Sequence, residues 1–172
     1  DNFFVRTDIL IKDSDQIKLI EVKAKSVDFT TEDGFLSKSG AIIPAWHAYL
    51  YDVAFQKYVL MKAFPGYKVS AYLMMADKNA LCPTDGLNQK FKLSKNEQGR
   101  TFVTVSENLS REDLTPPILK EIQVDSCCDL IYSQPIEAGG NSYSFIDYAK
   151  LLSDSYKNNN KLRMPISSMC KD

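Results

Sequence analysis

The sequence has little of what identifies the specialised classes of protein. It contains one histidine, one tryptophan and four cysteines in 172 residues, and its net charge is −1. That balance gives no excess of positive charge that would by itself indicate binding to nucleic acid. No apolar run approaches the roughly 18 residues of a membrane-spanning helix, and the first residues lack the pattern of a signal peptide. We therefore expect a cytoplasmic protein that has no membrane partner and makes any contact with nucleic acid locally.

The cysteines do not predict a disulfide framework. Cys127 and Cys128 are neighbours and are poorly placed to bridge each other, so a reducing compartment fits the sequence. A hydrophobic content of 44% over this length fits one globular domain that spans residues 1–172. The chain opens on Asp1 without Met and stops abruptly at Asp172, which leads us to expect a fragment of a longer protein.

A β-hairpin is predicted near the start of the chain. Residues 3–12 and 17–25 are rich in Ile, Val, Leu and Phe, and the Asp and Ser residues between them favour a turn. If the turn is centred between Ser14 and Asp15, cross-strand partners have numbers that add up to 29. The prediction therefore fixes a register as well as a pair of strands.

This register brings three charged side chains together. Asp8 would lie directly opposite Glu21, because 8 plus 21 meets the condition. Side chains alternate between the two faces of a strand, so Lys23 would project beside Glu21. The other face of the second strand would then pack through Ile20, Val22 and Ala24.

Two interpretations of this charged group are open. The charges could form a cross-strand salt bridge on a solvated face of the hairpin. Alternatively, the apolar residues around Asp8 indicate a strand buried on both faces, where a carboxylate is costly unless it has a partner or a metal ion. Ligation of a hard cation would offset that cost.

A helix and a further strand are predicted next. The helix begins at Pro44 and ends at residues 64–66, and a strand follows at residues 68–76. Gln56 falls on the apolar stripe of this helix, where its amide needs either a polar partner or a backbone group. His47 points away from the stripe, so we exclude it as a ligand. The stripe itself consists of Trp46, Tyr49, Val53, Leu60 and Ala63.

The order of these motifs resembles the PD-(D/E)xK nuclease superfamily. An acidic residue at Asp8 is followed by Leu19-Ile20-Glu21-Val22-Lys23 in the partner strand and then by a helix that carries Gln56. The likeness is greatest to the RecB-like exonuclease branch, which includes CRISPR-associated exonucleases with an iron–sulfur cluster. It implies an α/β fold with a restriction-endonuclease-like core, in which a mixed central β-sheet is flanked by helices. Residues 1–76 would form the catalytic core and residues 77–172 a family-specific extension.

The resemblance also implies the role of each residue. Asp8 and Glu21 would bind Mg²⁺ or Mn²⁺, and the carbonyl of Val22 would add a ligand. Lys23 would orient or deprotonate the attacking water, and Lys25, one step further along the same face, is a candidate phosphate contact. These residue types suit phosphodiester hydrolysis, which needs a positioned water and stabilisation of negative charge at phosphorus.

Two further positions relate to the resemblance. Gln56 would match the amide of the family's helical motif, but Leu60 stands where a tyrosine is usual, and Tyr58 is two positions after the glutamine. Cys170 resembles the approach to the cysteine trio of the iron–sulfur members. The four cysteines lack cluster spacing, so a cluster could form only in the intact protein.

The function implied is that of a Mg²⁺-dependent DNA nuclease, most readily an exonuclease, with DNA as its partner. Nothing in the sequence identifies protein partners such as a helicase. The alternative is a degenerate nuclease fold that serves as an interaction module for nucleic acid or protein. The presence of all three charged residues favours the enzyme, and no Arg-rich tract supports a transposase-like relative.

The second half of the sequence predicts structural elements only. We expect a hairpin around residues 91–93 and 101–105, a helical turn after Ser110, and a strand at 118–124. Two helices should follow at residues 126–133 and 142–156. The last of them would pack inward through Ile146, Ala149, Leu152 and Tyr156.

Overall fold

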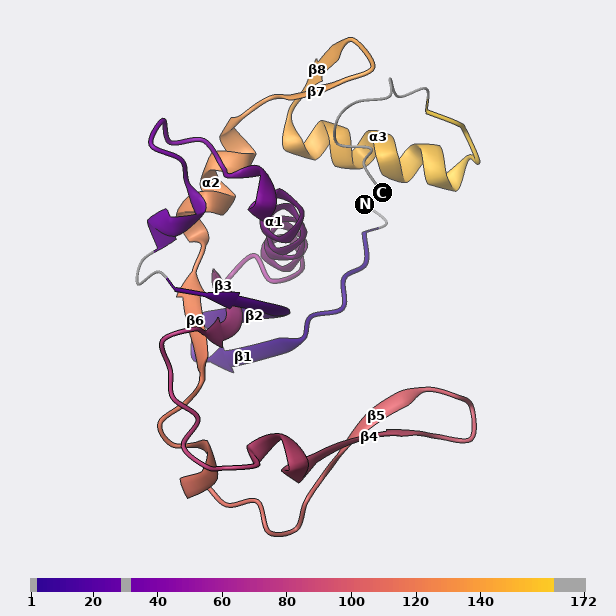
Figure 1. Cartoon of the computed structure of the whole chain (residues 1–172). Helices are drawn as coiled ribbons and strands as arrows, with labels where there is room; N and C mark the ends of the chain where they lie inside the picture. The colour runs from indigo at the N-terminus through magenta and orange to yellow at the C-terminus, as the bar shows by residue number, and fades with distance from the viewer. Residues whose placement is uncertain (1–2, 29–31, 163–172) are drawn as a thin grey trace. The chain divides into compact units, whose positions relative to one another are not determined.

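A computed structural model describes residues 3–28 and 32–162 of the chain. The fold is mixed α/β, with a four-stranded sheet of strand order β1-β2-β3-β6, three α-helices and two small hairpins among these residues (Figure 1). The described chain divides into two compact units, the first with residues 3–22, 32–73 and 122–162 and the second with residues 23–28 and 74–121. In the described chain, no helix is long and apolar enough to cross a membrane.

The predicted N-terminal hairpin is confirmed together with its register. β1 (Ile9–Asp13) pairs antiparallel with β2 (Gln16–Val27), and each cross-strand pair from Ile9↔Ile20 to Asp13↔Gln16 has numbers that add up to 29. Ser14 adopts a φ of 51°, which lets the two-residue turn close between the strands. The first strand begins at Ile9, later than the expected residue 3.

The burial of this hairpin differs from the prediction. β1 is the edge strand of the sheet, and its apolar residues are 37–47% exposed, so the expectation of a strand buried on both faces near Asp8 is wrong. The expected packing of Val22 and Ala24 is also wrong, because both are exposed. Ile20 is buried as expected, and Glu21 is buried too, on the face of β2 that it shares with Ile17 and Leu19.

The predicted helix and third strand are confirmed. The 3₁₀-helix η2 (Pro44–Trp46) leads into α1 (His47–Ala63), and β3 (Lys68–Asp77) follows. The 3₁₀-helix η1 (Glu32–Phe35) lies between β2 and η2 in the chain. Its Phe35 ring meets the Trp46 ring edge-on at 5.1 Å, which anchors this excursion to the start of α1.

Backbone hydrogen bonds show that the sheet is mixed. The N–H of Lys68, at the start of β3, donates to the carbonyl of Asp15 just before β2. The N–H of Lys78, just after β3, donates to the carbonyl of Val27 at the end of β2, so the two strands run parallel. β6 (Leu119–Gln123) runs antiparallel to β3. The N–H of Asp77, at the end of β3, donates to the carbonyl of Ile118 just before β6, and the N–H of Val124, just after β6, donates to the carbonyl of Ala71 near the start of β3. α1 therefore forms the crossover between two parallel strands.

Two further helices follow the sheet in the first unit. α2 (Asp125–Ser133) packs against α1, where the Tyr132 hydroxyl donates to the Ala54 carbonyl at 2.6 Å (Figure 1). α3 (Phe145–Lys157) begins after Ser144, whose side chain caps it by accepting from the N–H of Asp147. Between them lies a hairpin that the sequence analysis missed, formed by β7 (Ile136–Ala138) and β8 (Asn141–Tyr143).

The predicted inward face of α3 is only partly correct. Of the predicted residues, Ile146 and Ala149 are half-buried, whereas Leu152 is 44% and Tyr156 is 92% exposed. The first turn of α3 packs on α1 and α2 through Phe145, whose ring lies 5.2 Å from that of Tyr132. Leu152 and Tyr156, in the second half of the helix, therefore do not pack inward as predicted.

The second unit carries a separate two-stranded ribbon. β4 (Phe91–Lys95) follows the 3₁₀-helix η3 (Leu87–Lys90) and pairs antiparallel with β5 (Thr101–Val105), as predicted. The expected helical turn is η4 (Glu112–Leu114). A hydrogen bond from Lys90 holds the pKa of Asp113 at about 2 and joins η3 to η4. One face of the ribbon is apolar and exposed, and it consists of Phe91, Leu93, Val103 and Val105.

Candidate functional site

Asp8 lies at the open end of the N-terminal hairpin. It immediately precedes β1, and its Oδ2 accepts a hydrogen bond of 2.9 Å from the backbone N–H of Val22. The paired register of the hairpin ends at Ile9↔Ile20, next to Asp8 and Glu21, so their direct opposition stays a prediction. Because Oδ2 is engaged by Val22, Oδ1 is the carboxylate oxygen that could face a cation.

Glu21 is a buried carboxylate on the core face of β2. Its side chain is 7% exposed, and its Oε2 accepts a hydrogen bond of 2.8 Å from Nε2 of Gln56. A carboxylate among apolar neighbours is costly without such a donor. The bond therefore links β2 to α1 at the point where a charge would otherwise destabilise the core.

Gln56 meets side chains rather than backbone. Nε2 donates to Glu21 and also, at 3.2 Å, to Oδ1 of Asp52 one helical turn earlier. Gln56 is 5% exposed, and its Oε1 is buried without a hydrogen-bond donor among the described residues. Sequence reasoning placed the amide correctly but missed Asp52, although the four-residue spacing on α1 was a signal that could have found it.

Lys23 and Lys25 follow the site residues in β2, and both are half-buried. They belong to the second unit, whereas Asp8, Glu21 and Gln56 belong to the first. The role expected for Lys23 stays a prediction, and partial burial makes Lys25 less open than a typical phosphate contact.

The oxygen atoms at the end of this hairpin suit a hard divalent cation. Mg²⁺ usually takes one or two carboxylates and keeps several waters, and the donors here would be Asp8, Glu21 and the carbonyl of Val22. Among residues 3–28 and 32–162 there is no group of three or more His, Cys, Asp and Glu side chains that could hold a metal ion. Two carboxylates and one main-chain carbonyl are oxygen donors of the type that Mg²⁺ accepts in proteins.

The described cysteines are thiols with very different surroundings. Cys82 is exposed, whereas Cys127 and Cys128 are fully buried in α2. Burial raises the pKa of Cys128 to about 12, which makes its thiolate, the form that ligates iron, difficult to form. Cys170, singled out for its likeness to an iron–sulfur ligand, lies outside the described residues.

This difference predicts the order in which the thiols react. The pKa of Cys128 rises from 9.0 to about 12, so its thiolate fraction falls by about 1,000-fold at neutral pH. Iodoacetamide should modify Cys82 at least about 100-fold faster than Cys128, as measured by mass spectrometry of the resulting peptides. In urea the difference should disappear, and equal rates in the folded protein would contradict the buried position of Cys128.

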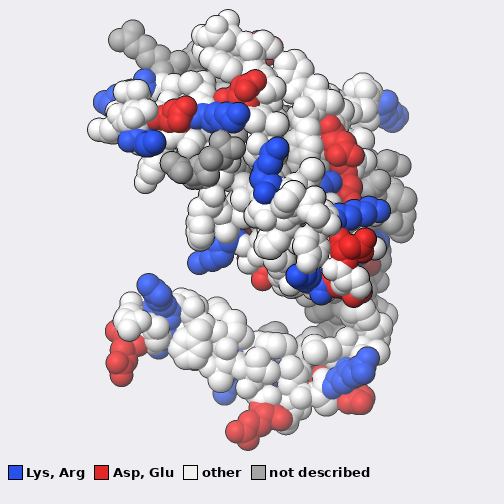
Figure 2. All heavy atoms as spheres, turned by 180° about the vertical axis from the view of Figure 1, so that it is seen from behind, with Lys and Arg blue, Asp and Glu red and all other residues white. Residues whose placement is uncertain are grey.

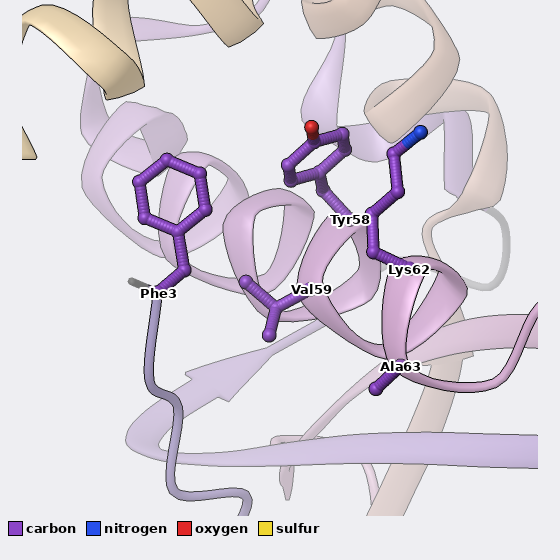
Figure 3. A pocket seen from close by; sticks show the side chains of 5 residues that line it. All are labelled: Phe3, Tyr58, Val59, Lys62 and Ala63. Carbon is purple, nitrogen blue, oxygen red and sulfur yellow. The ribbon is translucent and has the colours of Figure 1, made fainter. Parts of the chain in front are cut away.

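Charge and surface shape add little to the candidate site. On the face that Figure 2 draws, the Lys and Arg side chains are interspersed with Asp and Glu. An open pocket of about 310 Å³ lies between Phe3 and α1 (Figure 3). Its lining includes none of the residues predicted to bind metal or activate water, and it consists of Phe3, Tyr58, Val59, Lys62 and Ala63.

Comparison of the chain with protein families, with curated proteins and with solved structures gives no match. The geometry described above is therefore the basis for assigning a function.

Proposed function

We propose that the chain is the core of a Mg²⁺-dependent DNA nuclease, most readily an exonuclease, with a restriction-endonuclease-like fold. The observation that carries the proposal is the hydrogen bond from the N–H of Val22 to Asp8, which brings the Asp8 carboxylate to the residue that follows Glu21 in β2. Support also comes from the topology, since a hairpin, a crossover helix and a parallel strand follow one another in the order expected of such a core. The glutamine on the crossover helix reaches Glu21 directly.

Each residue has a distinct task in this proposal. Asp8 and Glu21 bind the cation, and the hydrogen bonds from Val22 and Gln56 hold their carboxylates in place. Bound Mg²⁺ would lower the pKa of a water and stabilise negative charge on the scissile phosphate. Lys23 would orient that water and, as the neutral amine, could accept its proton; the ammonium that forms would stabilise the negative charge that develops on the phosphate.

The test is cleavage of labelled linear and circular DNA by the full-length protein with Mg²⁺, with Mn²⁺ and with EDTA. We expect cleavage that depends on either metal ion and a loss of roughly 100-fold or more in Lys23→Ala, because general acid–base assistance typically contributes that much. Comparison of the two substrates distinguishes an exonuclease, which requires an end, from an endonuclease.

Lys38→Ala is the matched control, because it removes an exposed lysine that lies outside the hairpin. It should cleave DNA at the wild-type rate. Undiminished cleavage by Lys23→Ala would remove Lys23 from the mechanism. The absence of cleavage by the wild-type protein would favour an interaction module that retains a nuclease-like fold.

A further inference from the structure

Asp52 lies beside the candidate site but has no role in the mechanism set out above. It occupies an exposed position on α1, and its Oδ1 accepts a hydrogen bond of 3.2 Å from Nε2 of Gln56. The same nitrogen donates to Oε2 of Glu21 at 2.8 Å. One buried amide group therefore bridges two carboxylates that come from different elements of the first unit.

This bridge fixes the orientation of Gln56. A carboxylate oxygen can only accept, so the NH₂ group must face Glu21 and Asp52, and rotation of the amide would bring oxygen against oxygen. Both hydrogens of Nε2 are used in this arrangement. The orientation of Oε1 follows, because it is bound to the same carbon atom.

The side-chain oxygen of Gln56, Oε1, lacks a hydrogen-bond donor among the described residues. The atom is buried, and the side chain is only 5% exposed. Buried acceptors normally find a donor, so the atom indicates a ligand or a bound water beside the two carboxylates. A water in the shell of a hydrated divalent cation combines a hydrogen-bond donor with the positive charge that the carboxylates favour.

We propose that Asp52 is a positioning residue. It holds the amide of Gln56 so that Nε2 stays on Glu21 while Oε1 accepts from a water of the hydrated cation. This inference rests on the proposed function, since it assumes a cation at Glu21. It assigns no metal-ligating role to Asp52 itself.

The experiment compares Asp52→Ala with Asp52→Asn in the full-length protein. Asparagine keeps an oxygen that accepts from Gln56, whereas alanine removes it. We expect Asp52→Ala to weaken Mn²⁺ binding, measured by electron paramagnetic resonance, by about 10-fold, and Asp52→Asn to bind within about 2-fold of wild type. Asp129→Ala, which removes an exposed carboxylate from α2, is the matched control and should bind as wild type does.

A second readout reports on the amide without any metal. In wild type and Asp52→Asn, the side-chain NH₂ resonances of Gln56 should be well separated and slow to exchange with solvent, and Asp52→Ala should lose both properties. Wild-type Mn²⁺ affinity in Asp52→Ala overturns this inference alone. Equal weakening in both variants also overturns it, because charge rather than positioning would then be responsible. A wild-type protein that binds no Mn²⁺ overturns the cation and the proposed function together, whatever the NH₂ resonances show.

Discussion

Replacement of Glu21 by glutamine is expected to reduce metal-dependent DNA cleavage by roughly 100- to 1,000-fold while the fold remains intact. The new side chain still offers an oxygen to Nε2 of Gln56, so the bond between β2 and α1 is kept. A neutral amide is a weak ligand for Mg²⁺ compared with a carboxylate. The substitution therefore removes the charge that the cation needs and little else. The measurement is kcat/KM on labelled linear DNA, with urea unfolding as a check on stability.

Two comparisons sharpen this test. Glu137→Gln makes the same chemical change at an exposed position in β7 and should leave cleavage unchanged. Glu21→Ala should lose cleavage too, and in addition about 1–3 kcal/mol of unfolding free energy, because it removes the acceptor for a buried amide. If Glu21→Gln cleaved DNA as fast as wild type, Glu21 would be a structural residue and the metal site would lie elsewhere.

The second large effect concerns Asp125, the first residue of α2. Its Oδ1 accepts from Nζ of Lys57 at 2.7 Å and from the backbone N–H of Ala71 at 2.9 Å, and its Oδ2 accepts from Gln123 at 2.7 Å. Asp125→Ala removes one carboxylate that joins α1, β3 and α2, and it leaves the ammonium of Lys57 buried at 7% exposure. We expect the free energy of unfolding to fall by about 3 kcal/mol, as measured by urea denaturation.

Replacement of Lys57, the ion-pair partner of Asp125, should lower the free energy of unfolding by less. Lys57→Met leaves Asp125 with its other two donors, so a loss of about 1–2 kcal/mol is expected. Asp129→Ala removes an exposed carboxylate from the same helix and should change stability by less than about 0.5 kcal/mol. A loss in Asp125→Ala no larger than in Asp129→Ala would show that the ion pair contributes nothing measurable.

The same residue predicts how stability depends on pH. Burial by itself would raise the pKa of Asp125, but the hydrogen bonds from Lys57, Ala71 and Gln123 outweigh it and lower the pKa below 3.8. A carboxyl group with a lowered pKa stabilises the fold above its unfolded-state pKa, and this contribution disappears as the pH falls through the folded-state value. Unfolding free energy should therefore decline below about pH 4, and Lys57→Met should decline less steeply over the same range.

The sequence predicts the hairpin register well because two local signals agree. The residues at Ser14 and Asp15 favour a turn, and the apolar runs on either side have matching lengths, so one register satisfies both. The crossover helix and β3 are equally local, since helical spacing and a strand of apolar residues each appear within one short stretch. These elements required no knowledge of distant residues.

The burial of the two hairpin strands could not be predicted in the same way. One face of β2 carries Ile17 and Leu19, and the other carries Ile20 and Val22, so alternation alone gives two candidate core faces. Ile20 is buried as well as Ile17 and Leu19, so both faces are covered at this point of β2, and the contact of Glu21 with α1 depends on a residue 35 places later in the chain. The same long-range contact determines that Glu21 is buried.

Two further features, the β7–β8 hairpin and the role of Asp52, were not predicted, for different reasons. The β7–β8 hairpin has a local sequence signal, because Gly139-Gly140 between two short β-forming stretches is typical of a two-residue hairpin turn. The four-residue spacing places Asp52 on the same face of α1 as Gln56, but its role also depends on the amide of Gln56 turning toward Glu21, which helical periodicity does not encode. Candidate site residues on one hairpin were thus predictable, whereas the group that orients them required the tertiary fold.

The ribbon of the second unit has a consequence for the behaviour of the protein in solution. Each of its two strands has one edge without a hydrogen-bonded neighbour in its own sheet. An exposed edge strand with apolar side chains can pair with a strand of another chain, which leads to aggregation. Lys92 and Lys95 interrupt the apolar sequence of β4, so an identical strand aligned against it would bring like charges together. Repulsion between these lysines therefore opposes the stacking of identical ribbons into a filament.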